Sequence, residues 1–419
     1  MIDKDTLPKG WKLRKLGEVL DIQGGSQPPK SNFKYKPTEG FIQLLQIRDF
    51  GEKGVPTYVP KNRVTKFCTK DDILIARYGA SLGRIVTGLE GAYNVALAKV
   101  IDAENIFEKR FIFYLLKTPI FQGPLMQLSR SAQNGFSKGE IAHIELPVPS
   151  RPIQQKIVAN IEELFSELDN GKEQLKIAKA QLKIYRQAVL KWAFEGKLTG
   201  EKGVELQGIE PILPEGWKWA KLGEICNKIQ DGSHFSPQVQ YDGPGKNRFM
   251  YITAKNIRNN HMDLSKLIYI DKGFHESIYG RCNPEYGDLL LTKDGVNTGE
   301  VTLNTLHEPF SLLSSVCIFK TKKELLKTEF LKYYIQSPFG SKLINDSMTG
   351  TAIKRIILRK IRGANIVLPP IEEQHLIVQE IESRLSVCDK VEETINNSLQ
   401  QAETLRQSIL KKAFEGKLV

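Results

Sequence analysis

The chain has 419 residues, with 60 Lys and Arg against 48 Asp and Glu, which gives a formal net charge of +12. That length predicts two or more domains that each bury a core, and 41% hydrophobic with 26% charged residues excludes a wholly disordered chain. No apolar run approaches the roughly 20 residues of a membrane span, and the five scattered cysteines exclude a disulfide framework and fit a reducing cytoplasm.

The first recognisable segment of the chain is repeated later in the sequence. Residues 7–18 recur as residues 213–224 with nine of twelve positions identical, and both segments open with Leu-Pro-x-Gly-Trp. Residues 190–198 recur as residues 410–418 with eight of nine identical, and both contain Ala-Phe-Glu-Gly-Lys-Leu. Two copies of about 200 residues are too long and too few for a solenoid. We therefore expect a tandem duplication, with approximate two-fold symmetry inside the chain.

The first part of each copy, residues 1–150 and 201–370, alternates short β-branched and aromatic runs with Gly, Asn and Pro. Such runs predict strands, and short amphipathic stretches between them predict helices. The clearest strands are at 41–47, 73–76 and 315–319, and the clearest helices at 110–117 and 329–336. Each of these parts is therefore predicted to be a mixed α+β domain.

The second part of each copy, residues 151–200 and 371–419, has a different pattern. Ten of the eleven a and d positions from 157 to 192 are apolar, and the second copy repeats this seam from 377 to 409 with a break at Ser398. This is coiled-coil spacing, and the simplest partner for each helix is the other. Two long core helices in separate domains are the alternative.

The charge is distributed unevenly over these four segments. The net charge is +7 over 1–150 and +5 over 201–370, against +3 and −3 over the two helical segments 151–200 and 371–419. Two basic domains joined by a rigid spacer are typical of a protein that binds nucleic acid at two sites.

At this point the residues resemble the specificity (S) subunit of type I restriction–modification systems. The resemblance rests on the duplicated Leu-Pro-x-Gly-Trp starts, the Gly-Asp-Leu-Leu segment at 287–290 with Gly295 and Gly299, and the Leu-Pro-Pro-Ile-Glu-Glu-Gln run from 368. The Ala-Phe-x-Gly-x-Leu helix ends complete the set, which spans nearly the whole chain. The first copy departs from this pattern at Ile153, where the second copy has Glu373.

The resemblance implies two target-recognition domains, each reading one half of an asymmetric, bipartite double-stranded DNA target. It also implies that the two long helices pair as an antiparallel coiled coil, which sets the spacing of the half-sites. Two methyltransferase subunits would dock on this frame, and restriction (translocase) subunits can join them. The fold class is then α+β, with two tandem mixed α/β domains each followed by a long helix.

Signals for catalysis within this chain are weak. Residues 283–286, Asn-Pro-Glu-Tyr, lack the second Pro of the amino-methyltransferase motif, and no Gly-rich cofactor loop precedes them, so a turn is the better interpretation. No phosphate-binding GxxxxGK[ST] loop, HxxxH pair or CxxC pair occurs. We expect neither a cofactor nor a metal site, and expect methylation and cleavage to be carried by partner subunits.

Three loop regions in each copy are predicted to contact DNA. Small residues after the first strand let the backbone approach a phosphate, although an ordinary Gly turn is the alternative. Arg, Lys and Asn after a buried strand reach purine edges, and hydroxyls and cations before the last strand suit phosphates. With residues from the matched Ile-Arg segments at 47–48 and 257–258, the candidates are Gly25, Ser26, Gln27, Lys30, Arg48, Arg77, Tyr78, Ser81, Arg84, Arg130, Gln133, Asn134, Lys138, Ser233, His234, Lys255, Asn256, Arg258, Lys293, Asn297, Thr298, Thr349, Thr351, Lys354 and Arg355.

The ends of the copies suggest anchoring and docking. Trp11 and Trp217 follow Pro-x-Gly, and core anchoring is the better interpretation than base stacking. Gly196 and Gly416 are expected to end the long helices as C-caps. Four nearby side chains are predicted to dock partner subunits, with packing on the adjacent domain as the alternative for the aromatic pair: Phe194, Phe414, Glu373 and Gln374. A different class of function also stays open, a coiled-coil assembly scaffold whose basic domains bind RNA or protein.

Overall fold

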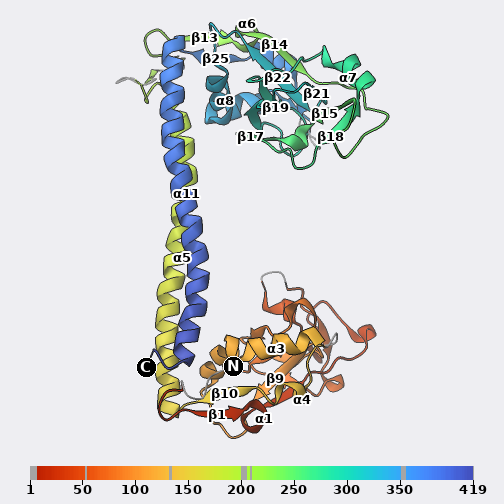
Figure 1. Ribbon diagram of the computed structural model, residues 1–419, viewed down its shortest axis with the longest axis vertical. Helices are drawn as coiled ribbons and strands as arrows, with labels where there is room; N and C mark the ends of the chain where they lie inside the picture. Colours follow the sequence, from red (N-terminus) through yellow and green to blue (C-terminus); the bar gives the residue numbers. More distant parts are fainter. Residues whose placement is uncertain are drawn as a thin grey trace. The chain divides into compact units, whose positions relative to one another are not determined.

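The computed structural model describes residues 7–51, 54–131, 135–199, 205–207, 210–350 and 355–418 (Figure 1). The chain divides into two compact units. Unit 1 is Met1–Lys176 together with Asn396–Val419, and unit 2 is Ile177–Ile395. Each unit therefore combines a globular domain with part of both long helices. Among the described helices, none is long and apolar enough to cross a bilayer.

The globular part of unit 1 contains a four-stranded antiparallel sheet in the order β2-β9-β6-β7 and a second sheet in the order β4-β3-β8-β5, in which β3 and β8 run parallel. A separate antiparallel pair, β1 with β10, joins the start of the domain to the segment before the first long helix. The strands are β1 (Lys12–Lys15), β2 (Asp21–Gly24), β3 (Phe41–Leu45), β4 (Tyr58–Pro60), β5 (Phe67–Cys68), β6 (Leu74–Ala76), β7 (Ile85–Val86), β8 (Gly91–Tyr93), β9 (Leu97–Ile101) and β10 (Glu145–Val148).

Four short helices complete this domain. They are α1 (Leu16–Val19), α2 (Lys109–Leu115), α3 (Pro119–Ser131) and α4 (Lys138–Ile141). Local capping explains two of the starts: the Glu108 side chain accepts from the amide of Phe111, and Ser137 with Glu140 forms a capping box at α4.

The globular part of unit 2 repeats this plan. Its main sheet has the order β14-β22-β19-β20, and β15 pairs antiparallel with β18 and parallel with β21. The strands are β11 (Glu205–Gln207), β12 (Glu210–Ile212), β13 (Lys218–Lys221), β14 (Cys226–Asp231), β15 (Arg248–Ile252), β16 (Ile257–Arg258), β17 (His261–Met262), β18 (Ile268–Asp271), β19 (Leu289–Thr292), β20 (Val301–Leu303), β21 (Phe310–Leu312), β22 (Val316–Thr321), β23 (Met348–Thr349), β24 (Arg355–Ile356) and β25 (Asn365–Leu368). The helices are α6 (Leu222–Ile225), α7 (Lys272–Tyr279), α8 (Thr328–Gln336), α9 (Pro338–Asp346) and α10 (Leu358–Gly363).

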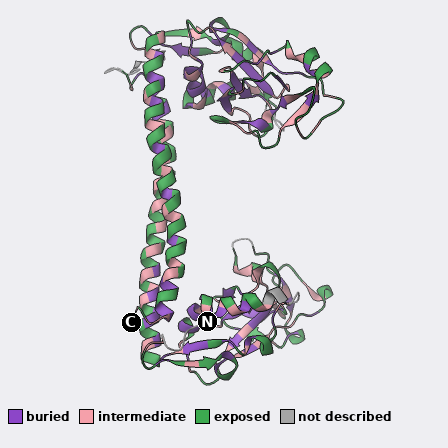
Figure 2. Cartoon of the chain, viewed as in Figure 1, coloured by how far each residue is buried: buried purple, intermediate pink, exposed green. Residues whose placement is uncertain are grey.

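The prediction of a duplicated α+β domain is confirmed by these matching sheets. Strands β2, β9, β6 and β7 correspond one by one to β14, β22, β19 and β20, and β1–β10 corresponds to β13–β25. The strand predicted at 73–76 is β6, and the helices predicted at 110–117 and 329–336 are α2 and α8. Figure 2 shows the buried residues concentrated in these globular parts.

The two long helices are α5 (Arg151–Phe194) and α11 (Ile371–Phe414), yellow and blue in Figure 1. In unit 1, Asp169 and Lys172 of α5 form ion pairs with Arg406 and Glu403 of α11 respectively. Residue numbers thus rise along one helix as they fall along the other, so the pairing is antiparallel.

Unit 2 contains the same antiparallel pairing between the other parts of these helices. Arg186 of α5 forms ion pairs with Asp389 at 2.8 Å and Glu392 at 3.1 Å in α11, and Lys179 lies 3.5 Å from Glu392. The predicted antiparallel coiled coil is therefore confirmed within each unit, against the alternative of two core helices in separate domains.

In each unit, the starting motif of one copy lies against the helix end of the other copy. In unit 1, Gly416 has a φ of +72°, and a Cβ added to it would lie 2.1 Å from Pro8 Cγ. In unit 2, Gly196 has a φ of +74°, and its Cβ would lie 2.6 Å from Pro214 Cγ. Each Leu-Pro-x-Gly-Trp start thus packs on the helix that ends the other copy. Both glycines are C-caps in the left-handed region, as predicted.

Candidate nucleic-acid interface

In unit 1, the three predicted loop regions lie against one another. The Arg77 guanidinium donates two hydrogen bonds to the Phe136 carbonyl, at 3.2 and 3.4 Å, and so joins the second region to the third. A Cβ added to Gly135 would lie 2.2 Å from the Arg77 carbonyl oxygen, and one added to Gly24 would lie 2.7 Å from Arg77 Nη1. Arg77 is therefore the side chain around which this loop cluster is built.

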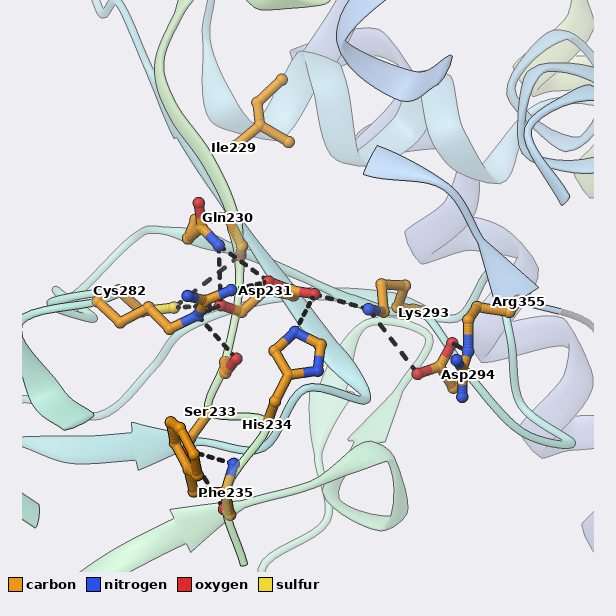
Figure 3. Close-up of polar contacts among 12 residues, drawn as sticks. Ile229, Gln230, Asp231, Ser233, His234, Phe235, Cys282, Lys293, Asp294 and Arg355 are labelled. Carbon is orange, nitrogen blue, oxygen red and sulfur yellow. Dashed lines mark hydrogen bonds and ion pairs between the residues drawn. The ribbon is translucent and has the colours of Figure 1, made fainter. Parts of the chain in front are cut away.

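In unit 2, the matched loops meet around Asp231, at the end of β14 (Figure 3). Its carboxylate lies 2.7 Å from Lys293 Nζ, 2.6 Å from Arg281 Nη2 and 3.0 Å from His234 Nε2. Arg355 from the third region reaches the cluster through Asp294, at 3.0 Å. One buried carboxylate thus holds side chains from several loops together.

The charge state of Asp231 follows from two opposed effects. Burial alone would raise the pKa of this carboxyl group, because desolvation disfavours the charged form. Hydrogen bonds from Lys293 and Arg281 outweigh burial and hold the pKa below its ordinary value. Asp231 is therefore ionised at neutral pH and neutralises the Lys293 ammonium, whose side chain is only 7% exposed.

The matched positions of the two units therefore differ in electrostatics. Gly24 and Arg77 in unit 1 correspond to Asp231 and Lys293 in unit 2, because Gly25 and Gly232 both pack against backbone carbonyls of the facing loop. Arg77 makes no ion pair with any described residue, whereas Lys293 is paired and buried. Within the described residues, unit 1 thus has a cation without a counter-charge where unit 2 has a neutralised pair.

Most of the other predicted DNA contacts lie at the surface. Arg48 donates to Thr57 Oγ1, Arg84 donates to the Phe50 carbonyl, and Lys138 forms an ion pair with Asp21. Ser81, Asn297 and Thr298 are half-buried. The exposed candidates are Gln27, Lys30, Arg48, Tyr78, Arg84, Lys138, His234, Lys255, Thr349 and Arg355.

Four predicted contacts have roles inside the chain. The Asn256 amide is buried and bonded to the amide of Thr253 and the carbonyl of Asp263. Arg258 lies within 4 Å of Asp263 and Glu300 and donates to a neighbouring carbonyl. Ser233 is buried, and its hydroxyl accepts from the amide of Phe235. Lys293 is the buried partner of Asp231, so these four side chains stabilise the loops in which they lie.

Ser26, matched to Ser233, differs from it. The Ser26 hydroxyl is buried and makes no hydrogen bond with a described residue. Gly25 is required by packing within the protein, since a Cβ at this position would lie 2.1 Å from the Asn94 carbonyl oxygen. Five candidates are only partly covered or not covered at all: Gln133, Asn134, Thr351 and Lys354 lie outside the described residues, and for Arg130 only the helical backbone of α3 is described.

The predicted exposed docking patch is wrong for both aromatic residues. Phe194 is 1% exposed, and its ring lies 5.1 Å from the rings of Phe330 and Tyr334 in unit 2. Phe414 is 2% exposed and lies 5.0 Å from the Phe111 ring in unit 1. Each helix end is buried because it completes a domain core, which is the alternative interpretation.

The docking prediction also fails for Gln374, which is fully buried. Its amide accepts from the Lys327 amide and donates to the carbonyls of Leu325 and Pro369. Gln154 makes the same three kinds of bond in unit 1 and was missed, although the matching glutamines were visible in the repeat. Glu373 is half-buried and accepts from the Thr199 hydroxyl at 3.0 Å.

Two further residues of the unit 2 cluster were missed. Asp231 stands inside a loop segment that the sequence highlighted, but nothing in the sequence marks it as the common partner of Lys293, Arg281 and His234. Arg281 is 50 residues away and carries no sequence signal of its role. Among the described residues, no three His, Cys, Asp or Glu side chains gather as metal ligands would.

Comparison with known proteins gives a consistent result. The family model described as "Type I restriction modification DNA specificity domain" matches twice, at residues 8–178 and 214–401. The type I restriction enzyme EcoBI specificity subunit of Escherichia coli is 26% identical over 97% of this chain and 86% of its own length. The MjaVIII specificity subunit of Methanocaldococcus jannaschii is 22% identical over 98% of this chain and 94% of its own.

Solved structures share the fold at low sequence identity. A chain from a structure of a type I R-M system has a TM-score of 0.70 at 19% identity, covering 98% of this chain and 99% of that one. The HsdS subunit from Thermoanaerobacter tengcongensis has a TM-score of 0.60 at 18% identity, covering 98% of both chains.

Proposed function

The chain belongs to the type I restriction–modification DNA specificity family, and we propose that it is the DNA-recognition subunit of such a system. In this proposal each unit reads one half of an asymmetric, bipartite target. The observation that carries it is the double match of the family model, with one match beginning in the globular domain of each unit. One duplex bound at two places is the simplest use of two such domains.

The loop clusters support an asymmetric target. The N–H groups of Arg77 that do not donate to the Phe136 carbonyl would donate to the O6 and N7 acceptors of guanine. At the matched place in unit 2, Lys293 is ion-paired with Asp231, so the exposed His234 would contact the base there instead. Two scaffolds of one design with different loop chemistry would read different bases. The exposed cations Lys30, Lys255 and Arg355 would contact phosphates, which add affinity without sequence preference.

The paired helices would set the distance between the half-sites and dock two methyltransferase subunits, with restriction subunits as an optional addition. The support is that α5 and α11 each continue without a break from one unit to the other. The partners would carry methylation and cleavage, and this chain would supply recognition without catalysis. A genomic DNA target in a prokaryotic cell would also mean that the protein acts in the cytoplasm.

Selection of duplexes from a random pool, with the partner methyltransferase present, tests this function. We expect enrichment of a two-part motif with a constant spacer. Insertion of four residues into both helices, which breaks the heptad register, should change the spacer or abolish binding. A featureless pool, with RNA or a protein binding equally well to the isolated chain, would favour the scaffold alternative.

A further inference from the structure

A cavity of about 610 Å³ in unit 1 gathers four cationic side chains. It lies between β7, helix α2 and the adjoining parts of α5 and α11, and the described residues that line it include no carboxylate. We call it the cationic cavity after the charged groups that line it: Arg84, Arg110, Lys117 and Arg406.

Lys117 is the least compensated of the four. Its ammonium lies 3.7 Å from the centre of the Phe113 ring and forms no ion pair with a described residue. Burial and, to a smaller extent, the positive charges of Arg406, Arg110 and Arg84 together lower the pKa of Lys117 to about 8. Keeping these cations together without an anion opposes folding.

The carboxylates near the cavity balance only part of this charge. Arg110 forms an ion pair with Glu162 at 2.7 Å, and Arg406 forms one with Asp169 at 2.8 Å. Arg84 donates to a backbone carbonyl and has no ion pair among the described residues. Two positive charges, on Lys117 and Arg84, therefore have no carboxylate partner among the described residues.

Unit 2 demonstrates that the fold does not require these cations. Gly83 and Gly299 are equivalent, because their amides donate to the carbonyls of the matched residues 76 and 292. The residues that follow them, Arg84 and Glu300, therefore occupy the same position in the two units. Thr118 and Ser337 are equivalent, because the hydroxyl of each donates to the carbonyl three residues earlier at 2.6 Å. The residues directly before them, Lys117 and Gln336, therefore occupy the same position in the two units.

Of the remaining two positions, one loses its cation in unit 2 and one keeps it. Glu329 stands where unit 1 has Arg110, because both precede the matched residues Phe330 and Phe111. Arg186, the counterpart of Arg406, is held between Asp389 and Glu392. At the position of Phe113, unit 2 buries a lysine of its own, Lys332. Three of the four cationic positions of unit 1 are nevertheless acidic or neutral in unit 2, so the larger cationic set in unit 1 points to a ligand.

We propose that the cationic cavity binds a phosphate-bearing anion, a function beyond DNA recognition by the loops. Guanidinium groups donate paired hydrogen bonds to phosphate oxygens, and a lysine adds a compact positive charge. The ring faces of Phe113 and Phe165 are already covered by Lys117 and Arg406, which leaves little aromatic surface for a nucleobase. The chemistry thus fits a polyphosphate better than a base. A phosphate of the DNA backbone offers the same chemistry.

Titration calorimetry with inorganic tripolyphosphate and the full chain at low salt tests this proposal. We expect one site, weakened about 10- to 100-fold by Lys117→Gln, the loss typical of one charge-assisted hydrogen bond. The substitution copies the residue of unit 2 at this position, so the fold should tolerate it. Lys117→Arg should retain binding. Lys61→Gln, which removes an exposed lysine of unit 1 outside the cavity, is the matched control for net charge.

Proton uptake gives a second readout. An anion next to Lys117 raises its pKa, so binding at pH 8 should take up part of a proton, and binding at pH 6.5 should take up almost none. The uptake is measured from the dependence of the binding enthalpy on the ionisation enthalpy of the buffer, and it should vanish in Lys117→Gln. The charged and titratable groups that face Lys117 or its arginine neighbours are Arg84, Arg110, Tyr114, Glu162, Asp169 and Arg406.

Binding to nonspecific duplex DNA distinguishes the two sources of phosphate. If the anion is a DNA phosphate, Lys117→Gln should lower the salt dependence of duplex binding by about one unit of slope. If it is a free polyphosphate, duplex binding should stay unchanged while tripolyphosphate binding is lost. Tripolyphosphate and duplex binding that are both unaffected by Lys117→Gln would overturn the proposal, whatever the outcome for sequence-specific recognition.

Discussion

Replacement of Asp231 by Asn should destabilise unit 2 strongly, because it leaves the buried Lys293 ammonium with only the more distant Asp294 as a counter-charge. Both side chains are less than 10% exposed and are separated by 2.7 Å. Removing one partner of a buried ion pair typically costs about 3–5 kcal/mol. Arg281 and His234 are more exposed and regain water, and Asp294 lies 3.9 Å from Lys293. We therefore expect the lower end, about 3 kcal/mol.

The assay combines urea unfolding with hydrogen exchange in the native state. The amide of Ile318 in β22, which is paired with Leu290 in β19, reports on opening of the sheet that carries Asp231 and Lys293. A double-mutant cycle with Lys293→Met isolates the coupling. The double variant should lose less stability than the sum of the two single variants, since it leaves no buried unpaired charge. A cost below about 1 kcal/mol for Asp231→Asn, or strict additivity, would refute the reasoning.

The same ion pair predicts a pH dependence. The pKa of Asp231 is lowered in the folded state from its ordinary value of 3.8. Its contribution to stability is therefore complete above that value and is lost as the pH falls through the lower folded pKa. The difference in stability between the wild type and Asp231→Asn should be constant near neutral pH and shrink below about pH 4, as followed by urea midpoints. A difference that persists at the lowest pH would contradict the assignment.

Three further substitutions test other parts of the structure. Phe414→Ala should cost about 3–5 kcal/mol in urea unfolding, because it leaves a cavity beside Phe111; an unchanged midpoint with weaker partner binding would restore the docking interpretation. Gln374→Ala should cost about 2–4 kcal/mol, because it removes the hydrogen-bond partner of three backbone groups, one of them in a fully buried bond, while Gln374→Glu retains the acceptor and loses the donors. Arg77→Ala should weaken binding by about 1–3 kcal/mol at one base of the target in competition assays, and a uniform loss over all sequences would mean a phosphate contact.

The architecture was predictable because it is periodic or repeated. Heptad spacing over some 40 residues identifies a coiled-coil helix, and near-identical segments at both ends of each copy identify the duplication. Trp11 and Trp217 are buried at 9% and 7% exposure, as their place in the repeat predicted. Such signals are spread over many residues, so no single side chain decides them.

The site was less predictable, because a side chain's exposure depends on contacts that are distant in sequence. Lys293 and Asn256 are polar residues in loops, which favours the surface, but Asp231 and Asp263 draw them inside. Phe194 and Phe414 stand at the ends of mostly polar helices, where no local pattern shows the domain core that receives them.

By itself, the sequence determined that this protein is a duplicated α+β chain with two coiled-coil helices and basic globular domains. Only the tertiary structure decided that each helix end closes a core to which the other copy's starting motif also belongs. It also decided that Arg77 has no ion pair among the described residues where Lys293 is neutralised, and that four cations distant in sequence share one cavity. The physical reason is that periodicity and repeats are visible in the order of residues along the chain. Burial and ion pairing instead depend on contacts between residues that are distant in sequence and that only folding brings together.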